Sequence, residues 1–223
     1  MAYMKDFPSA QLVSGTSLDL AIQAMNNCYG NTCTIKSLIG SIRAGHLSLL
    51  EHVTATFDIL CSEAVLKQIS RHRHLSPTVE SSRGSDITDN GFYIHPFTEY
   101  KGKTFASFDE DYNTLYGEFT AQEYIRRLYD NILFQYHAMV NKGIPREVAA
   151  YILPMATMVR MRYTGNLRAW FEYLQKRLCK RASIEHRELA EKIYKELNLT
   201  YPDIFNKEML GMCVNCKERG CSF

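Results

Sequence analysis

The sequence predicts an α+β fold, a mixed protomer with a small central antiparallel sheet, helices around it and a long helical C-terminal half. Apolar and polar residues alternate over residues 53–59, which is typical of a strand with one buried face. Apolar residues recur at helical spacing over residues 120–141 and 166–199. Strands do not alternate regularly with helices, so a doubly wound parallel sheet is not expected.

The N-terminal part is expected to begin with two short helices. Ser17 is placed to cap the first, which continues through Met25 and ends at residues 29–32. The second covers residues 34–44, and Gly45 is its C-terminal stop. Both helices precede the predicted strand.

Beyond the strand, a further helix is expected over residues 62–70. Residues 84–113 are rich in Gly, Asp, Asn, Thr and Tyr, which predicts a long loop with short strands. Loops of this length are usually functional or mobile, so this one could close over a bound ligand. The helix over residues 120–141 follows and is stopped by Gly143.

The remaining C-terminal part is expected to be helical. Pro145 occupies a favoured first-turn position for a helix over residues 146–153. Residues 166–199 then form one very long helical pattern, straight or kinked. No glycine-rich phosphate loop of either common type is present, so a dinucleotide would be bound by side chains.

The composition is that of a globular protein. The 223 residues carry a net charge of +2, with 46% hydrophobic and 22% charged residues. We expect a single domain over residues 1–210 and a Cys-containing tail over residues 211–223. The small net charge does not favour nucleic acid as a partner. No apolar run approaches the ~18 residues of a membrane helix, and the N-terminus lacks a signal-peptide core, so we expect a cytoplasmic protein.

The tail contains Cys213, Cys216 and Cys221. A Cys-x-x-Cys pair can hold zinc, but a structural zinc site normally needs four ligands, and no histidine follows Cys213. Zinc is the less favoured alternative, and we expect free thiols and no metal site.

One short segment is dense in cationic groups. Arg71, His72 and Arg73 are followed, after seven residues, by Ser81 and then by Arg83. Unpaired charge is costly to bury, so the segment is not expected to be plain core. Arginine forks bind phosphate well, which favours a pocket for a multiply charged anion. On charge alone, a solvated basic turn is the more common outcome.

Two other groups of polar residues are candidates for the same site. His46 and Ser48 lie shortly before the predicted strand. Asn166, Tyr173 and Arg177 are spaced so that they share one face of a helix. A lone histidine is more often structural, and a charged helix face is more often merely solvated, so neither group alone predicts a function.

The basic segment resembles the signature of the flavin-dependent thymidylate synthases, which is Arg-His-Arg, seven residues and Ser. Three further blocks resemble that family in the same order. They are Gly-His-x-Ser followed by Glu-His from residue 45, Pro-Arg-Glu-Val-Ala and Leu-Pro from residue 145, and Asn-x-Arg with a later Arg and Ala-x-x-Glu from residue 166. Four ordered blocks over residues 45–190 identify the chain as a member of this family.

The resemblance implies an enzyme that methylates dUMP to dTMP. Methylenetetrahydrofolate would supply the carbon, and NADPH would reduce FAD, which carries out the redox chemistry. It also implies a homotetramer of mixed α/β protomers with FAD at the subunit interfaces.

The resemblance assigns roles to individual residues. Arg177, Ser81 and His46 would act at the reacting centre, with Arg177 favouring ionisation of the uracil at N3. The cofactor would be bound by Ser48, Arg71, His72, Arg73, Asn166 and Arg168, with His46 on the flavin and folate side. The nucleotide would be bound by Gln68, Arg71, Glu80, Ser81, Arg83 and Arg177. Ser81 has no obvious base, so direct hydride transfer from the flavin is the simpler mechanism.

The chain departs from the family pattern at four positions. Ala150 and Arg181 stand where the family often has Arg and His, Gly84 stands where an aromatic often follows, and Glu172 stands where an Asn can contact flavin. Altered specificity, for dCMP or a hydroxymethyl product, is therefore an alternative, although ordinary drift is favoured. A nucleic-acid-binding module without catalysis, built on residues 71–83 and the Tyr-rich loop, is the alternative from another class.

Overall fold

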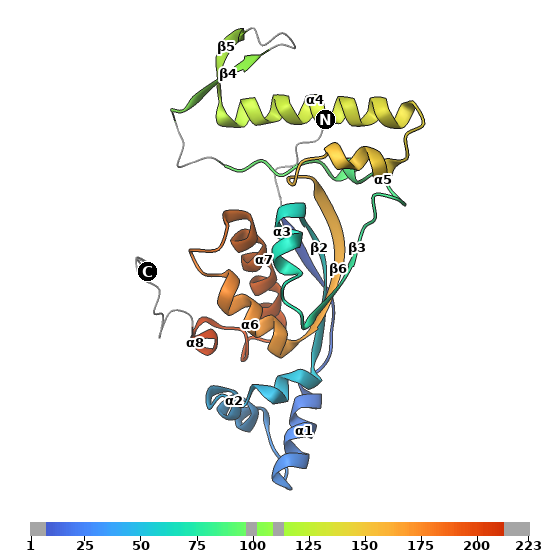
Figure 1. Cartoon of the computed structure of the whole chain (residues 1–223). Coiled ribbons are helices and arrows are strands. Elements are labelled where there is room, and N and C mark those ends of the chain that lie inside the picture. Colours follow the sequence, from blue (N-terminus) through green and yellow to red (C-terminus); the bar gives the residue numbers. More distant parts are fainter. Residues whose placement is uncertain (1–7, 97–101, 109–113, 212–223) are drawn as a thin grey trace. The chain divides into compact units, whose positions relative to one another are not determined.

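The computed structural model describes residues 8–96, 102–108 and 114–211 (Figure 1). The chain divides into two compact units. The described residues of the first, which we call the sheet unit, are 8–61, 65–79 and 160–211. Those of the second, which we call the α4 unit, are 62–64, 80–96, 102–108 and 114–159. A single domain over residues 1–210 stays a prediction.

The sheet unit is built around a four-stranded sheet with the order β1-β2-β6-β3. Its strands are β1 (Ser9–Gly15), β2 (Thr54–Ser62), β6 (Met158–Asn166) and β3 (Leu75–Val79). The pairs β1–β2 and β3–β6 are both antiparallel. Pro77 lies in β3, an edge strand, where a residue without a backbone N–H is tolerated. The predicted α+β class and its small antiparallel sheet are confirmed.

Strands β1 and β6 were not predicted. Burial in β6 nearly alternates, with Met161 and Tyr163 inside and Arg160 and Arg162 exposed, so a period of two was present. Arginine at every second position and the helical patterns on either side obscured it. Arg162 instead forms a two-pronged ion pair with Asp58 of the neighbouring strand, with both N···O distances at 2.8 Å.

The N-terminal helices are α1 (Asp19–Tyr29) and α2 (Ile35–Arg43), close to the predicted ranges. Thr34 caps α2 through a capping box, and Gly45 follows the helix with a positive φ of 93°. A 3-10 helix, η1 (Leu47–His52), then leads into β2.

The predicted continuous helix over residues 166–199 is wrong, because the structure has two helices there. They are α6 (Leu167–Arg177) and α7 (Ile184–Thr200), and a short helix α8 (Lys207–Leu210) follows. A straight helix of the predicted length would extend about 50 Å, too far for its whole apolar face to be buried on one small unit. The break lets both α6 and α7 bury apolar faces in the core of the sheet unit.

The α4 unit contains a two-stranded antiparallel sheet of β4 (Thr104–Phe108) and β5 (Thr114–Thr120), followed by the 21-residue helix α4 (Ala121–Asn141). Thr120 caps α4 with a capping box, as expected for a helix that starts there.

The rest of the α4 unit is short helical turns. The loop between β3 and β4 contains a 3-10 turn, η2 (Ile87–Asn90). The helix predicted over residues 146–153 is the short α5 (Arg146–Ala149), which tightens into η4 (Ala150–Ile152). Helix α3 (Glu63–Ile69) joins the two units along the chain. Among the described residues, no helix is both long and apolar enough to cross a membrane.

Candidate functional site

A cavity of about 380 Å³ lies in the sheet unit where the chain after α3 meets α6. Its lining consists of Arg71, His72, Arg73, His74 and Leu75 from the turn after α3, and Ala169, Glu172, Lys176 and Arg177 from α6. Three guanidinium groups and one ammonium group face a single carboxylate. The volume is that of a small-molecule site, and the excess of positive charge favours an anion.

A tight turn carries the basic residues from α3 to the cavity. The His72 N–H donates to the Ile69 carbonyl at 2.9 Å, and the Leu75 N–H donates to the His72 carbonyl at 3.0 Å. Leu75 is buried and anchors the start of β3, whereas Arg71 and Arg73 remain exposed. The fold therefore fixes the backbone of the turn and leaves two guanidinium groups available to a ligand.

Helix α6 supplies the opposite wall. Glu172 and Lys176 are four residues apart and share one helix face, and Arg177 is next to them. Trp170 holds the helix on the sheet, since its indole N–H donates to the carbonyl of Ala55 at 3.0 Å within the core. The charged wall is therefore mounted on a packed helix.

His72 and Arg177 are joined across the cavity, although they are 105 positions apart in sequence. Nε of Arg177 donates to Nε2 of His72 at 3.0 Å. The pKa of His72 is lowered to about 4, mainly by burial and then by the charges of Arg177 and Lys176, while the charge of Glu172 acts in the opposite direction. A neutral imidazole can accept this bond, so Arg177 is held in place without being neutralised.

A buried layer supports this pair. Tyr173 packs edge-on against His72, with ring centroids 5.0 Å apart, and lies 5.7 Å from the ring of His186. Nδ1 of His186 lies 3.2 Å from Oε1 of Gln68. Burial, followed by the charges of Arg177 and His72, lowers the pKa of His186 to about 3. Gln68, a predicted nucleotide ligand, is therefore in contact with His186 and does not line the cavity.

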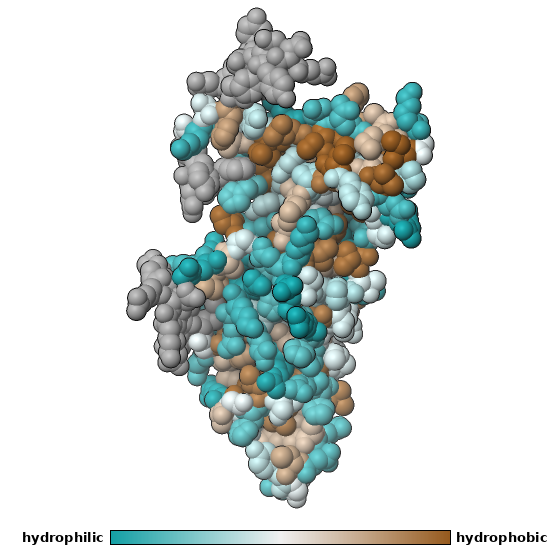
Figure 2. All heavy atoms as spheres, in the orientation of Figure 1, coloured by the Kyte–Doolittle hydropathy of each residue, from teal (hydrophilic) through white to brown (hydrophobic). Residues whose placement is uncertain are grey.

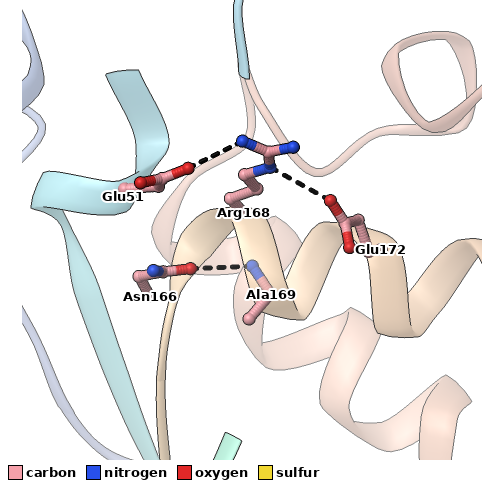
Figure 3. A network of polar contacts seen from close by, with 5 residues as sticks. All are labelled: Glu51, Asn166, Arg168, Ala169 and Glu172. Carbon is pink, nitrogen blue, oxygen red and sulfur yellow. Dashed lines mark hydrogen bonds and ion pairs between the residues drawn. The ribbon is translucent and has the colours of Figure 1, made fainter. Parts of the chain in front are cut away.

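Asn166 and Arg168, both predicted flavin ligands, bond to protein groups at the start of α6 (Figure 3). Oδ1 of Asn166 accepts the N–H of Ala169 at 2.8 Å and so caps the helix. Arg168 lies between two carboxylates, bonding Glu51 of η1 at 2.7 Å and Glu172 at 3.0 Å. Both carboxylates raise the pKa of Arg168. The flavin role of these two residues stays a prediction.

His46 and Ser48 lie at the start of η1, and both are exposed. Neither lines the cavity, but the ion pair between Glu51 and Arg168 ties their segment to α6. Their predicted place at the flavin and folate side is untested.

Glu80, Ser81 and Arg83 belong to the α4 unit, where each has local partners. Glu80 accepts hydrogen bonds from Ser85 at 2.8 Å and from Asn90 at 2.6 Å. The Ser81 hydroxyl accepts the N–H of Arg83 at 3.2 Å, and the Arg83 guanidinium pairs with Glu147. Among the described residues, no base is hydrogen-bonded to Ser81, so these contacts give no means of activating it as a nucleophile.

Three residues of the site were missed by the sequence prediction. His74 and Lys176 line the cavity, and His186 is buried against Tyr173. Lys176 could have been found, because it lies one helical turn after Glu172 and next to Arg177. His186 had no such signal, because a polar residue on a mostly apolar helix face gives no indication of its partner.

Of the four departures from the family pattern, only Glu172 lines the cavity. Arg181 is exposed between α6 and α7, Ala150 lies at the junction of α5 and η4, and Gly84 is exposed after the basic segment. No group of three or more His, Cys, Asp or Glu in the described part of the chain could hold a metal ion. The cysteines predicted to form free thiols in the tail lie outside it.

Fold and cavity together define an α+β protein with a small-molecule cavity in which cationic side chains predominate. A sequence model of the family described as "Thymidylate synthase complementing protein" matches residues 11–203. The chain belongs to this family, that of the flavin-dependent thymidylate synthases. The predicted family and the predicted enzyme class, a methyltransferase, are confirmed.

Individual relatives agree with this assignment. A probable flavin-dependent thymidylate synthase of Mycobacterium phage L5 is 34% identical over 201 residues, which is 84% of this chain and 79% of the relative. One from Mycobacterium phage D29 is 36% identical over 166 residues, which is 72% of this chain and 67% of the relative. The crystal structure of a UMP/dUMP methylase, PolB from Streptomyces cacaoi, bound with 5-Br UMP has the same fold. Its TM-score is 0.69 at 22% identity, over 89% of this chain and 92% of that one.

Proposed function

We propose that the chain catalyses the FAD-dependent reductive methylation of dUMP to dTMP, with methylenetetrahydrofolate as carbon donor and NADPH as reductant. The observation that carries the proposal is the cavity itself, which unites Arg71, His72 and Arg73 with Arg177 from a distant part of the sequence. The names of the relatives, and the bound 5-Br UMP and 5-Br dUMP of PolB, support the class of substrate.

The residues around the cavity fit a phosphorylated flavin. Arg71, Arg73 and Lys176 offer guanidinium and ammonium donors to phosphate oxygens. Asn166, Arg168 and Ser48 are the other residues that we expect to hold FAD. When bound, FAD supplies a carrier for the hydride that reduces the transferred carbon.

Arg177 is the residue that we expect to act on the pyrimidine. Its Nε–H is used by His72, which leaves its other N–H groups for a carbonyl or ring nitrogen of the nucleotide. A guanidinium stays charged throughout, so it can stabilise the negative charge that develops on the ring during ionisation. The hydrogen bond to His72 fixes the orientation of the Arg177 guanidinium.

The nucleotide would also be bound by Gln68, Glu80, Ser81 and Arg83. Ser81 would direct the substrate through its hydroxyl and would not attack it, since no base among the described residues bonds it. His46 would lie at the reacting centre on the folate side.

We also infer self-association into a homotetramer, with FAD at the subunit interfaces. Large apolar side chains are exposed in the α4 unit, on α4 and on the α5–η4 segment, and Figure 2 shows hydrophobic surface there. Apolar surface of this kind is typical of a protein interface.

The test is the absorbance of the purified protein between 300 and 550 nm, with FAD, NADPH and nucleotide added anaerobically. The expected result is a flavin band that NADPH bleaches and that returns only when dUMP and methylenetetrahydrofolate are both present. A protein that binds no FAD and forms no dTMP would refute the proposal. dCMP in place of dUMP tests the altered-specificity alternative, and salt-sensitive binding to DNA or RNA without flavin would indicate the nucleic-acid-binding module.

A further inference from the structure

Glu172 is the one acidic residue among those that line the cavity. Every other charged group there is cationic, so a carboxylate weakens the attraction of the site for a plain anion. Its side chain is 38% exposed, so a ligand in the cavity can reach it. Such a group is unfavourable for a site that binds phosphate alone.

The carboxylate is held in a fixed orientation. Oε1 of Glu172 accepts Nε–H of Arg168 at 3.0 Å, and Arg168 is held from its other side by Glu51 at 2.7 Å (Figure 3). Oε2 of Glu172 accepts no hydrogen bond from any residue that the structure describes. One oxygen is therefore anchored, and the other is available as a hydrogen-bond acceptor at the cavity.

We propose that Glu172 is a specificity residue whose free oxygen accepts a hydrogen bond from an N–H or O–H group of the bound ligand. The site would then select a phosphorylated ligand that also carries a donor. FAD, the cofactor of the proposed function on which this inference rests, has such donors in its flavin imide and its ribityl hydroxyls. Inorganic pyrophosphate at neutral pH has charge but almost no donor, so it is the matched probe.

The experiment measures the dissociation constants of FAD and of pyrophosphate for the full chain and for the variant Glu172→Gln. Glutamine keeps the shape and can still accept the bond from Arg168, but it then turns its NH₂ group toward the ligand. We expect FAD to bind about tenfold more weakly, because an acceptor has become a donor. We expect pyrophosphate to bind as well as before or about threefold more tightly, because a negative charge has been removed.

Opposite effects on the two ligands distinguish this role from a structural one. Weaker binding of both ligands would mean that Glu172 only maintains the site, and tighter binding of both would mean that it only repels anions. Unchanged FAD binding would also overturn the proposal. The matched control is Glu51→Gln. It removes the other carboxylate that is paired with Arg168, at a position that does not line the cavity, and is expected to change each affinity by less than about twofold.

A second variant covers the case in which Glu172→Gln does not fold. Glu172→Asp keeps the charge and withdraws the acceptor by one methylene, so FAD should bind more weakly and pyrophosphate equally well. Equal binding of FAD by this variant would contradict the inference. Failure of the unmodified chain to bind any FAD would instead refute the proposed function itself.

Discussion

Two histidines of the sheet unit are kept neutral by their surroundings. His72 and His186 both have a pKa far below the ordinary value, mainly because of burial and then because of nearby Arg177. A cationic imidazole would repel that guanidinium, and a protonated Nε2 of His72 could not accept the hydrogen bond from Arg177. Neutral histidines can position Gln68 and Arg177 through hydrogen bonds without adding charge to the buried layer.

The neutral state of His186 predicts an acid-sensitive fold. Its pKa is about 3 in the folded state and about 6.5 when unfolded, so its contribution to stability is complete above pH 6.5 and is lost as the pH falls toward 3. We expect the free energy of unfolding to fall by about 2 kcal/mol between pH 6.5 and pH 4.5 through this residue. Urea denaturation across this range measures it.

The variant His186→Gln keeps a hydrogen-bonding group beside Gln68 but does not titrate, so it should lose less stability over the same pH range. His52→Gln, which replaces an exposed histidine at the end of η1, is the control substitution outside the buried layer. Equal slopes for the unmodified protein and His186→Gln would contradict this account.

At the scale of elements, Asn166 at the start of α6 is expected to have two roles. Asn166 caps the helix through Oδ1, and it is also a predicted flavin ligand. We expect Asn166→Ala to lower the free energy of unfolding by about 1 kcal/mol, because the Ala169 N–H loses its partner. Asn166→Asp keeps an acceptor oxygen, so its stability should match that of the unmodified protein to within about 0.5 kcal/mol.

FAD titration separates the role of Asn166 as a helix cap from its predicted role as a flavin ligand. Asn166→Asp removes the amide N–H groups but leaves the cap, so its FAD affinity should fall if the side chain binds the cofactor. FAD binding by Asn166→Asp that equals that of the unmodified protein would show that Asn166 is a cap alone.

Some helices and strands could be predicted from the sequence, and others could not. Capped helices such as α2 and α4 were predicted closely, because Thr34 and Thr120 begin a local, amphipathic pattern. Strand β6 was missed because its exposed positions hold arginine, whose partner Asp58 lies on another strand. The break between α6 and α7 was missed for a similar reason, since only packing on the sheet limits the length of a helix.

The site was predictable where its residues lie on one short segment or on one face of a single helix. The basic segment and Arg177 were singled out, and the cavity unites them. The bond between His72 and Arg177 was not predictable, because it depends on side-chain positions set by the turn after α3 and by the packing of α6. The pair Arg168–Glu172 has the i,i+4 spacing of a helix and could have been predicted, but the contact of Arg168 with Glu51 depends on how η1 packs on α6.

At the scale of the whole molecule, exposed apolar side chains bear on assembly. In the α4 unit, Phe134 is 69% exposed and Tyr151 is 91% exposed. Val148 and Met155 lie near Tyr151 in sequence and are each about half exposed. Single exposed apolar residues are ordinary, but several large ones on the same short segment are typical of a surface that another chain covers.

Disrupting this surface should therefore dissociate the proposed tetramer. We expect the double variant Phe134→Lys/Tyr151→Lys to have a lower mass than the unmodified protein in sedimentation equilibrium, because charged side chains are costly to bury at an interface. FAD affinity should fall with the mass, because the cofactor is proposed to bind between subunits. Leu199→Lys is the control, since Leu199 is 82% exposed on α7, in the other unit, and should leave the mass unchanged. A double variant that keeps both the mass and the FAD affinity of the unmodified protein would place the subunit interface elsewhere, and loss of mass with full FAD binding would mean that one protomer holds the cofactor alone.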